Sequence, residues 1–440
     1  MIRLTQIMAV SAAVCWCTAC AVNAQEDDAS GSTAQATAHM LLRGINVKTL
    51  GAVGDGKHDD TAAFQKAIEM TGQVEPGDDK YFDPKAILVP PGHYRITAPL
   101  LIKHSRRQTQ GAHRGIKVMG ASGGHHRWTQ LGPHGNPDLY TELFWDGPEK
   151  GTMFDVWGTH SMHISNLLLN GRNKTAVLIS INSPRGAGSA NHILRNIELV
   201  NSHVGFECGN DSYICSSDMS FYDVRWIDCN TAFRTVSDQN LNYNFVRCGA
   251  ANTGIMFDFQ KGGSAVITLP STYSVGTFLR VGSGGINAGT FTVNGCRLDG
   301  ARYRAERTVV PDAKGETNVV FSGLLTSCTG LWPKTNEDGT KGPPPENTPM
   351  FVLGPHANVL VQGSMISGNV AKLTGSDDQL PTWIQFDNCR FRVRSDPRTM
   401  IETDEASGYE LRNCVVTTDD GQNIMVSKRK APAQEELTDE

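Results

Sequence analysis

The stretch "INVKTLGAVGDGKHDDTAAFQKAIE" (residues 45–69) joins a short apolar segment, a glycine-rich acidic turn and an amphipathic segment. Gly51 and the later Gly56-Lys57 come close to the phosphate-loop pattern G-x-x-x-x-G-K-[ST]. His58 stands where that pattern needs a hydroxyl group, and no alternating strand–helix pattern follows it. A nucleotide site is therefore not expected here.

The acidic residues of this stretch also lack the spacing and the closing glutamate of a calcium-binding loop. "TAAFQKAIEM" follows them, and its apolar residues Ala63, Phe64, Ala67 and Ile68 fall on one helical face. Asp59 or Asp60 is well placed to cap the start of that helix. We therefore predict a turn that shapes the chain, followed by a helix over residues 60–70.

The stretch 45–69, followed by "AILVPPGHYRI" (86–96), resembles the N-terminal segment of the pectate-lyase superfamily with rhamnogalacturonase/epimerase-like domains. In that family these segments close the first coils of a right-handed parallel β-helix. The resemblance implies a fold more strongly than a reaction. The superfamily contains lyases, hydrolases, epimerases and binding spikes of the phage type.

From residue 160 onward a short unit recurs: apolar, two residues, apolar or Cys, one residue, apolar. The units are "ISNLLL" (164–169), "LRNIEL" (194–199), "FYDVRW" (221–226), "FVRCGA" (245–250), "VNGCRL" (293–298), "FDNCRF" (386–391) and "LRNCVV" (411–416). Their third residue is mostly Asn, Asp or Gly, which tolerate a left-handed backbone. Each unit therefore predicts a strand, a tight bend and a second strand.

Units at this spacing without helical periodicity are typical of a solenoid, whose stacked coils share one core. We predict an all-β, single-stranded right-handed parallel β-helix over residues 45–425, with a short N-terminal capping helix. "FSGLLTSC" (321–328) and "VLVQGSMI" (359–366) are weaker examples of the unit.

The two ends of the chain differ in composition from the repeats. Residues 1–24 have the layout of a signal peptide with a cleavage site after Ala24, although Cys20 offers a lipidation site instead. Residues 25–44 are expected to form a flexible leader and residues 426–440 a charged, disordered tail. No later segment is apolar for the roughly 20 residues that span a bilayer. An exported protein, periplasmic or extracellular, is predicted.

The net charge of −5 gives no electrostatic reason to expect nucleic acid as a partner. An exported protein meets an oxidising compartment, where disulfides are permitted. Cys208 and Cys215 are the favoured pair. Four other cysteines occupy one inward position of their units and are predicted to be buried free thiols: Cys248, Cys296, Cys389 and Cys414.

Binding and catalysis on such a fold use outward residues that stack from coil to coil. The outward position of successive units holds Leu168, Glu198, Arg225 and Gly249, and later Arg297 and Arg390. The region 195–247 is also dense in acidic and basic residues. A solvated face with cross-strand salt bridges is the ordinary explanation of such charges. The functional alternative is a site formed by Glu198, Asp211, Asp218, Arg225 and Asp238.

Three reactions suit these residues, on a polysaccharide substrate. A lyase needs a base and a cation that stabilises the enolate-like state of a uronate, and calcium is a candidate cofactor. A hydrolase needs two carboxyl groups flanking the glycosidic bond. An epimerase would share the proton abstraction of the lyase. We expect a lyase acting on an acidic polysaccharide by β-elimination, with a glycoside hydrolase or a non-catalytic polysaccharide-binding protein as alternatives. The oligomeric state is left open.

Overall fold

The computed structural model describes fourteen stretches of the chain: residues 44–71, 86–103, 113–122, 140–183, 188–209, 216–237, 240–282, 289–299, 308–310, 317–326, 349–375, 382–392, 400–418 and 421–432. The chain divides into two compact units, Met1–Ile45 and Asn46–Glu440. The elements below lie in the second unit, apart from the first residue of strand β1 (Ile45–Asn46).

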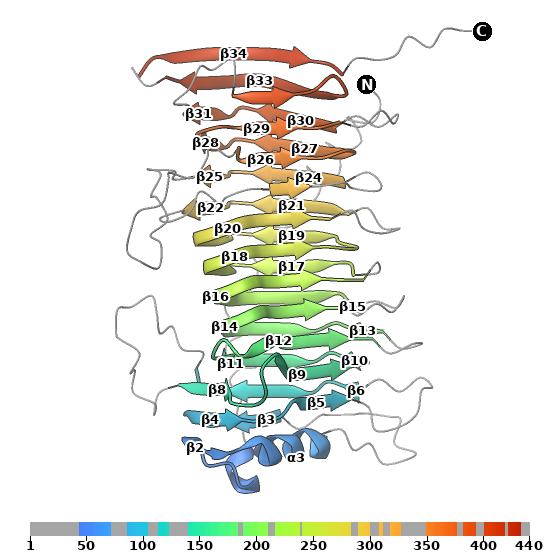
Figure 1. Cartoon of the computed structure of the whole chain (residues 1–440), viewed down its shortest axis with the longest axis vertical. Coiled ribbons are helices and arrows are strands. Elements are labelled where there is room, and N and C mark those ends of the chain that lie inside the picture. Colours follow the sequence, from blue (N-terminus) through green and yellow to red (C-terminus); the bar gives the residue numbers. More distant parts are fainter. Residues whose placement is uncertain are drawn as a thin grey trace, which may run out of the picture. The chain divides into compact units, whose positions relative to one another are not determined.

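Parallel strands dominate the described residues (Figure 1). The first are β2 (Asp55–Asp59), β3 (Ala86–Val89), β4 (Gly92–Ile96), β5 (Leu100–Lys103), β6 (His113–Arg114), β7 (Lys117–Gly120), β8 (Thr141–Trp145), β9 (Gly151–Trp157) and β10 (Thr159–His160). The middle strands are β11 (His163–Asn170), β12 (Thr175–Asn182), β13 (Ser189–Ala190), β14 (Ile193–Cys208), β15 (Ser216–Ser217), β16 (Met219–Thr235), β17 (Tyr243–Val246), β18 (Gly249–Phe259), β19 (Ala265–Thr268), β20 (Ser271–Val281), β21 (Thr290–Asn294) and β22 (Arg297–Asp299). The last are β23 (Thr308–Val310), β24 (Thr317–Ser322), β25 (Leu325–Thr326), β26 (Phe351–Leu353), β27 (Ala357–Gln362), β28 (Met365–Ser367), β29 (Ala371–Leu373), β30 (Thr382–Asp387), β31 (Arg390–Arg392), β32 (Ile401–Thr403), β33 (Ser407–Thr417) and β34 (Asn423–Lys430).

The acidic turn has the structural role that the sequence predicts. The carboxylate of Asp60 accepts hydrogen bonds from the backbone N–H groups of Val53 (2.7 Å) and Gly54 (3.3 Å). Its backbone carbonyl accepts the first helical bonds of α3 (Thr61–Thr71). Asp59 accepts a hydrogen bond from the N–H of Thr61 (3.1 Å). The turn, which follows the short 3-10 helix η1 (Val47–Leu50), is thus tied to the start of α3.

Helix α3 covers the backbone edge of an early strand, as expected of a capping helix. The side-chain oxygen of Gln65 accepts a hydrogen bond from the N–H of Leu101 (2.9 Å), and its amide nitrogen donates to the carbonyl of the same residue (3.3 Å). Ala63, Phe64, Ala67 and Ile68 are buried, as predicted. The helix therefore protects a sheet edge whose free backbone groups would otherwise invite pairing with another chain.

Replacing Gly54 by alanine is expected to destabilise this end of the protein by about 1–3 kcal/mol. Gly54 has a φ of +72°, and an added Cβ would lie 2.8 Å from Cε1 of the buried Tyr94. Chemical unfolding of the variant measures the loss. Gly421→Ala is a control for backbone strain alone, because its φ is +82° but nothing lies within 4 Å of the added Cβ. Equal losses in the two variants would contradict a steric role for Tyr94.

The predicted bends are present at every unit. Their third residues all have positive φ values, between 50° and 64°: Asn166, Asn196, Asp223, Arg247, Gly295, Asn388 and Asn413. Neighbouring bends also contact one another. The side chain of Asn196 donates to that of Asn166 (2.8 Å), and Arg247 donates two hydrogen bonds to Asp223 (2.8 and 2.7 Å).

The core lies inside the strands and is rich in aromatic rings. Phe221 on β16 stacks on Phe245 of β17 at 4.7 Å between ring centroids. It also meets Phe206 (5.0 Å) and Phe233 (5.4 Å) edge to face. The registers Leu194↔Phe221 and Phe221↔Phe245 show that one inward position is repeated from strand to strand.

The cysteine predictions have a mixed outcome. Cys248, Cys296, Cys389 and Cys414 are buried and free, as predicted. The predicted Cys208–Cys215 disulfide is wrong. Cys208 is also a free, buried thiol, and it lies 3.5 Å from the sulfur of Met219. Cys215 lies outside the described residues.

The fold-class prediction needs a correction. The chain is all-β with a single α-helix among the described residues, but the open right-handed parallel β-helix solenoid is wrong. Strand β14 pairs with β11 through residues 193–200 and with β12 through residues 204–208, so it continues past its bends. The strands thereby join into one 30-stranded sheet, parallel except for β34 and closed around a shared core, in the described part of the chain. Bends that looked like strand ends only redirect the strand.

The remaining strands form a second, smaller sheet and the C-terminal edge of the large one. Strands β15, β13, β10 and β6 form a separate four-stranded sheet, which is parallel throughout. β34 is antiparallel to β33 and extends to Lys430, beyond the predicted domain limit at residue 425. Figure 1 places β33 and β34 at the opposite end of the strand stack from α3.

Candidate functional site

One outward ladder of the large sheet spans five strands, four of which contribute an acidic or basic residue. Its register runs from His93 on β4 to Glu142 on β8, then to Leu168 on β11. It continues to Glu198 on β14 and Arg225 on β16. The predicted outward ladder of Leu168, Glu198, Arg225 and Gly249 is therefore confirmed, and it extends further toward the N-terminus.

The structure places three of the five predicted site residues. Glu198 is only 3% exposed, and Arg225 lies directly opposite it and is half-buried. Asp218 is exposed at a bend with a φ of 55°, where its carboxylate accepts from the side chain of Asn242 (2.9 Å). The bend at Asp223 separates it from Arg225 along the chain, so it does not share the ladder. Asp211 and Asp238 lie outside the described residues.

Sequence reasoning missed a hydrogen-bonded chain of side chains around Glu142. Nδ1 of His93 lies 2.5 Å from one carboxylate oxygen of Glu142, and Nε2 of the same ring lies 3.4 Å from the hydroxyl of Tyr140. The amide of Asn170 donates to the other carboxylate oxygen (2.9 Å). Asn201 in turn donates to the side-chain oxygen of Asn170 (3.0 Å). Both oxygens of Glu142 are thereby fixed in direction.

These contacts set the charge of Glu142. Burial favours a protonated carboxyl, but the hydrogen bonds from His93 and Asn170 outweigh it and hold the pKa of Glu142 below its ordinary value. Burial, together with the nearby Glu142 charge, raises the pKa of Tyr140 to about 12. At neutral pH the site therefore contains an ionised Glu142 beside a neutral tyrosine hydroxyl.

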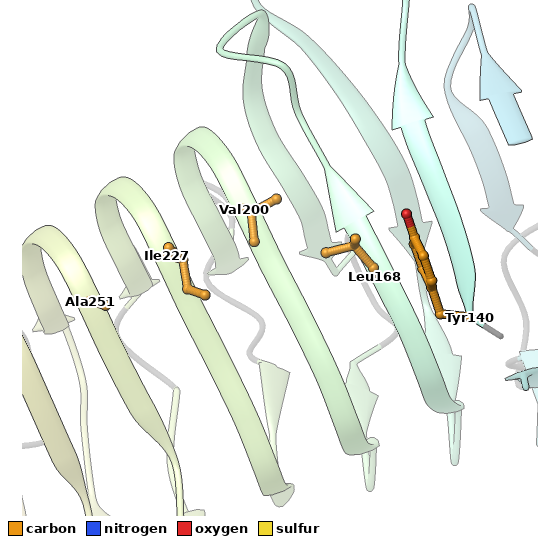
Figure 2. Close-up of a cluster of buried hydrophobic side chains, with 5 residues drawn as sticks. All are labelled: Tyr140, Leu168, Val200, Ile227 and Ala251. Atoms are coloured by element: carbon orange, nitrogen blue, oxygen red, sulfur yellow. The ribbon is translucent and has the colours of Figure 1, made fainter. Parts of the chain in front are cut away.

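Apolar side chains border the acidic residues. Figure 2 shows Tyr140, Leu168, Val200, Ile227 and Ala251 in a row across neighbouring strands, and each is at most 7% exposed. Leu168 separates Glu142 from Glu198 on the ladder. Val200 follows Glu198 by two positions and therefore lies on the same face of the strand. Because the row is buried, it packs beside the carboxylates of the ladder and fixes the strands that carry them.

A second ladder of charged residues differs from the first because its charges pair with one another. Glu207 pairs in register with Arg234, Arg234 with Asp258, and Asp258 with Arg280. Arg234 donates to Glu207, with its Nε at 2.7 Å, and Arg280 donates twice to Asp258, at 2.7 and 2.5 Å. Its charges neutralise one another, which is the cross-strand pairing expected of charged strands. We assign this ladder a structural role.

The described residues also bear on metal binding and membrane insertion. Across the described ranges, no three or more His, Cys, Asp or Glu residues gather in a way that could hold a metal ion. In the same part of the chain, no helix combines the length and apolar character needed to cross a membrane.

Comparison with known proteins supports the resemblance drawn from the sequence. The family model "Rhamnogalacturonase A/epimerase, pectate lyase-like" matches residues 44–130, which confirms the similarity to the pectate-lyase superfamily in that region. No curated protein matches the chain by sequence.

Solved structures with a similar fold include two of DFA-IIIase from Arthrobacter chlorophenolicus A6 in complex with GF2. The one without its lid has a TM-score of 0.58 and 11% identity, and the other has 0.55 and 10%. In both cases the match covers 84% of this chain and 94% of the other. The catalytic unit of the GH87 alpha-1,3-glucanase from Streptomyces thermodiastaticus strain HF3-3 has a TM-score of 0.48 and 12% identity over 83% of this chain and 68% of the other.

Proposed function

From the similarity of residues 44–130 to the pectate-lyase superfamily, we propose that this protein is a carbohydrate-active enzyme that cleaves a glycosidic bond. Glu142 and Glu198 are its two catalytic carboxyl groups in this proposal. The observation that supports it most is their position on one outward ladder with a single strand between them. The similar fold of DFA-IIIase, whose structures contain GF2, agrees with a carbohydrate substrate.

The spacing of the two glutamates favours hydrolysis with inversion. Neighbouring strands lie about 4.8 Å apart, so residues two strands apart on a ladder have Cα atoms about 9–10 Å from each other. Inverting glycosidases hold their carboxyl groups roughly 6.5–9.5 Å apart, which leaves room for the attacking water, whereas retaining enzymes hold them about 5–5.5 Å apart. Glu142 and Glu198 suit the wider arrangement.

We assign the two glutamates different roles in this reaction. Glu142 is kept ionised by His93 and Asn170, so it serves as the base that takes a proton from water. The water oxygen then attacks the anomeric carbon. Glu198, buried beside Leu168, donates a proton to the departing glycosidic oxygen. His93 and Tyr140 act on Glu142 by positioning, and Arg225 lies beside Glu198, where it can contact a substituent of the sugar.

Elimination is the second candidate, and Arg225 is the observation that favours it. A guanidinium opposite a carboxylate on the same ladder can pair with a uronate carboxylate in two hydrogen bonds while the carboxylate takes the alpha proton. Such a lyase would act on an acidic polysaccharide, with calcium as a candidate cofactor. Export, with cleavage after Ala24, is part of the same proposal, and an intact Met1 in the native protein would contradict it.

A product assay distinguishes these reactions. The purified protein is incubated with a panel of neutral and uronate-containing polysaccharides, with added calcium or with a chelator. New reducing ends without the ultraviolet absorbance of an unsaturated uronate are expected for hydrolysis. Reducing ends together with that absorbance would support the lyase. Retention of a polymer without cleavage would contradict both and support a binding protein.

Replacing Asn170 by alanine is expected to shift the acidic limb of the pH–activity profile to higher pH. The variant loses a hydrogen bond to ionised Glu142, so the pKa of Glu142 rises. Because the folded pKa is depressed, the stabilisation is present above the ordinary value of 4.5 and is lost as the pH falls through the folded pKa. The variant should therefore lose about 1–3 kcal/mol of stability near neutral pH and less in acid.

Asn182→Ala is the matched control. Its amide also donates to a strand carboxylate, that of Asp155 (3.0 Å), on a different ladder. Activity is measured across the pH range for the two variants and the unaltered protein. An acidic limb that stays in place for Asn170→Ala, or moves equally in both variants, would contradict the positioning role of Asn170.

A further inference from the structure

Four cysteines share one inward position of the sheet, but only two of them are neighbours. The registers Met365↔Arg390 and Arg390↔Val415 place the preceding residues Ser364, Cys389 and Cys414 on consecutive strands. Val415 donates its N–H to the carbonyl of Cys389 (2.9 Å), which fixes this alignment.

The other two thiols in this position have no cysteine beside them. Cys248 has Val224 and Pro270 as its neighbours in the adjoining strands, and Cys296 has Pro270 and Leu324, by the same register. In the described strands this position therefore contains two thiols with no cysteine opposite them, Cys248 and Cys296, and one adjacent pair, Cys389 and Cys414.

The geometry of this pair suits a covalent link. Opposed residues in neighbouring strands have Cα atoms about 4.8 Å apart, within the roughly 4.4–6.8 Å seen for disulfides. Both side chains point into the core and are buried, with Cys389 2% exposed and Cys414 fully inaccessible. Side chains in register on neighbouring parallel strands have roughly the same spacing, about 4.8 Å, which is close to the upper end of the Cβ–Cβ range of disulfides, about 4.5 Å.

The two thiols also differ in acidity in a way that suits exchange chemistry. A hydrogen bond between them raises the pKa of the Cys389 thiol, to which burial also contributes, and lowers the pKa of the Cys414 thiol. The thiolate is the nucleophile in thiol–disulfide exchange, so Cys414 is the thiol that attacks first.

We propose that Cys389 and Cys414 form a disulfide bond that joins β31 to β33 under oxidising conditions. Both thiols are buried once the sheet has formed, so the exchange takes place while the strands that carry them are open, as during folding. With a low-molecular-weight disulfide as oxidant, the Cys414 thiolate then attacks one of its sulfur atoms and releases one small thiolate. Cys389 then loses its proton and attacks the Cys414 sulfur of the mixed disulfide, which releases the second small thiolate. Two protein thiols are oxidised, and one small disulfide is reduced to two thiols.

The disulfide would hold the last two strands, β33 and β34, to the rest of the sheet. β33 pairs with β30 and β31 on one side and carries the antiparallel β34 on the other. β33 and β34 are the last strands in the chain. A bond from Cys414 to Cys389 would therefore link them covalently to the segment that leads into β31. A cross-link of this kind stabilises mainly by restricting the unfolded chain.

Peptide mapping tests the proposal directly. The full-length protein is incubated with oxidised glutathione, alkylated under denaturing conditions and digested with trypsin. Cleavage after Lys372, Arg390, Arg412 and Lys428 leaves Cys389 and Cys414 on separate peptides, 373–390 and 413–428, with no other cysteine on either. We expect these two peptides to be recovered as one disulfide-linked species that reduction separates, and the oxidised protein to melt at least about 2 °C higher.

Serine variants provide the controls, because Ser364 already occupies the same inward position one strand earlier. Cys389→Ser and Cys414→Ser should abolish both the linked species and the rise in melting temperature, and Cys296→Ser should change neither. Recovery of both peptides in alkylated form from the unaltered protein would overturn the proposal. A link from either cysteine to another partner, or a linked protein with an unchanged melting temperature, would overturn it as well.

Discussion

Replacing Glu142 by glutamine is expected to lower kcat about 10²- to 10⁴-fold, the usual contribution of a general acid or base. The glutamine keeps the size of the side chain and a hydrogen-bond acceptor for His93 but cannot take a proton from water. Glu198→Gln should cause a loss of similar size, because the departing oxygen then receives no proton. Reducing-end release at saturating substrate measures both variants.

Glu402→Gln is the control for these substitutions. Glu402 is also a strand glutamate, but its side chain is 64% exposed, and it pairs with Lys372 far along the chain from Glu142. This variant should keep full activity. Circular dichroism and melting temperature verify that each variant is folded. Full activity in a folded Glu142→Gln or Glu198→Gln protein would show that the site is misplaced, even if the reaction is assigned correctly.

Truncating Phe221 to alanine is expected to cost about 3–5 kcal/mol of unfolding free energy. The ring is fully buried and meets Phe206, Phe233 and Phe245 at 4.7–5.4 Å between centroids. Removing it leaves a cavity, because its neighbours come from three different strands (β14, β16 and β17) and are held there by the sheet hydrogen bonds. Denaturant unfolding followed by tryptophan fluorescence measures the loss.

Val266→Ala serves as the comparison, since Val266 also lies on a strand but is 43% exposed. Its loss should stay within about 0.5 kcal/mol, as is usual for surface substitutions. A cost for Phe221→Ala no greater than that of Val266→Ala would contradict a shared aromatic core between the strands.

The bends were predictable because Asn, Asp and Gly are the residue types that most readily adopt a positive φ. Asn, Asp and Gly accept positive φ values at low cost, so their recurrence marks the bends. Gly323 and Gly363, in the two weaker units, also have positive φ values, of 68° and 54°. The bend at Leu269 could not be predicted, because leucine rarely adopts its φ of 52°. The bend between β19 and β20 was therefore missed.

The closure of the sheet could not be predicted from the sequence. A left-handed residue between two apolar segments looks the same whether the strand ends there or changes direction. The two cases differ only in the hydrogen bonds between neighbouring strands. β14, for example, pairs with β11 before its bend and with β12 after it. Those hydrogen bonds join residues that are far apart in the sequence, so a local sequence pattern cannot predict them.

Half of the candidate site followed from the repeat. Glu198 and Arg225 occupy the outward position of recognisable units, so their alignment could be predicted. Glu142 and His93 lie in "TELFW" (141–145) and "GHYRI" (92–96), which precede the first recognised unit and do not show its strand–bend–strand pattern. The alternation of apolar residues in these segments predicts strands, but it does not reveal which strands are neighbours.

The configuration of the first product tests the central claim most directly. Proton NMR recorded during the first turnovers on a cleaved polysaccharide identifies the anomer released at the new reducing end. Two carboxyl groups separated by one strand predict the inverted anomer, with no unsaturated sugar formed. A retained anomer would contradict the separation assigned to Glu142 and Glu198, and an unsaturated product would show that the reaction is elimination.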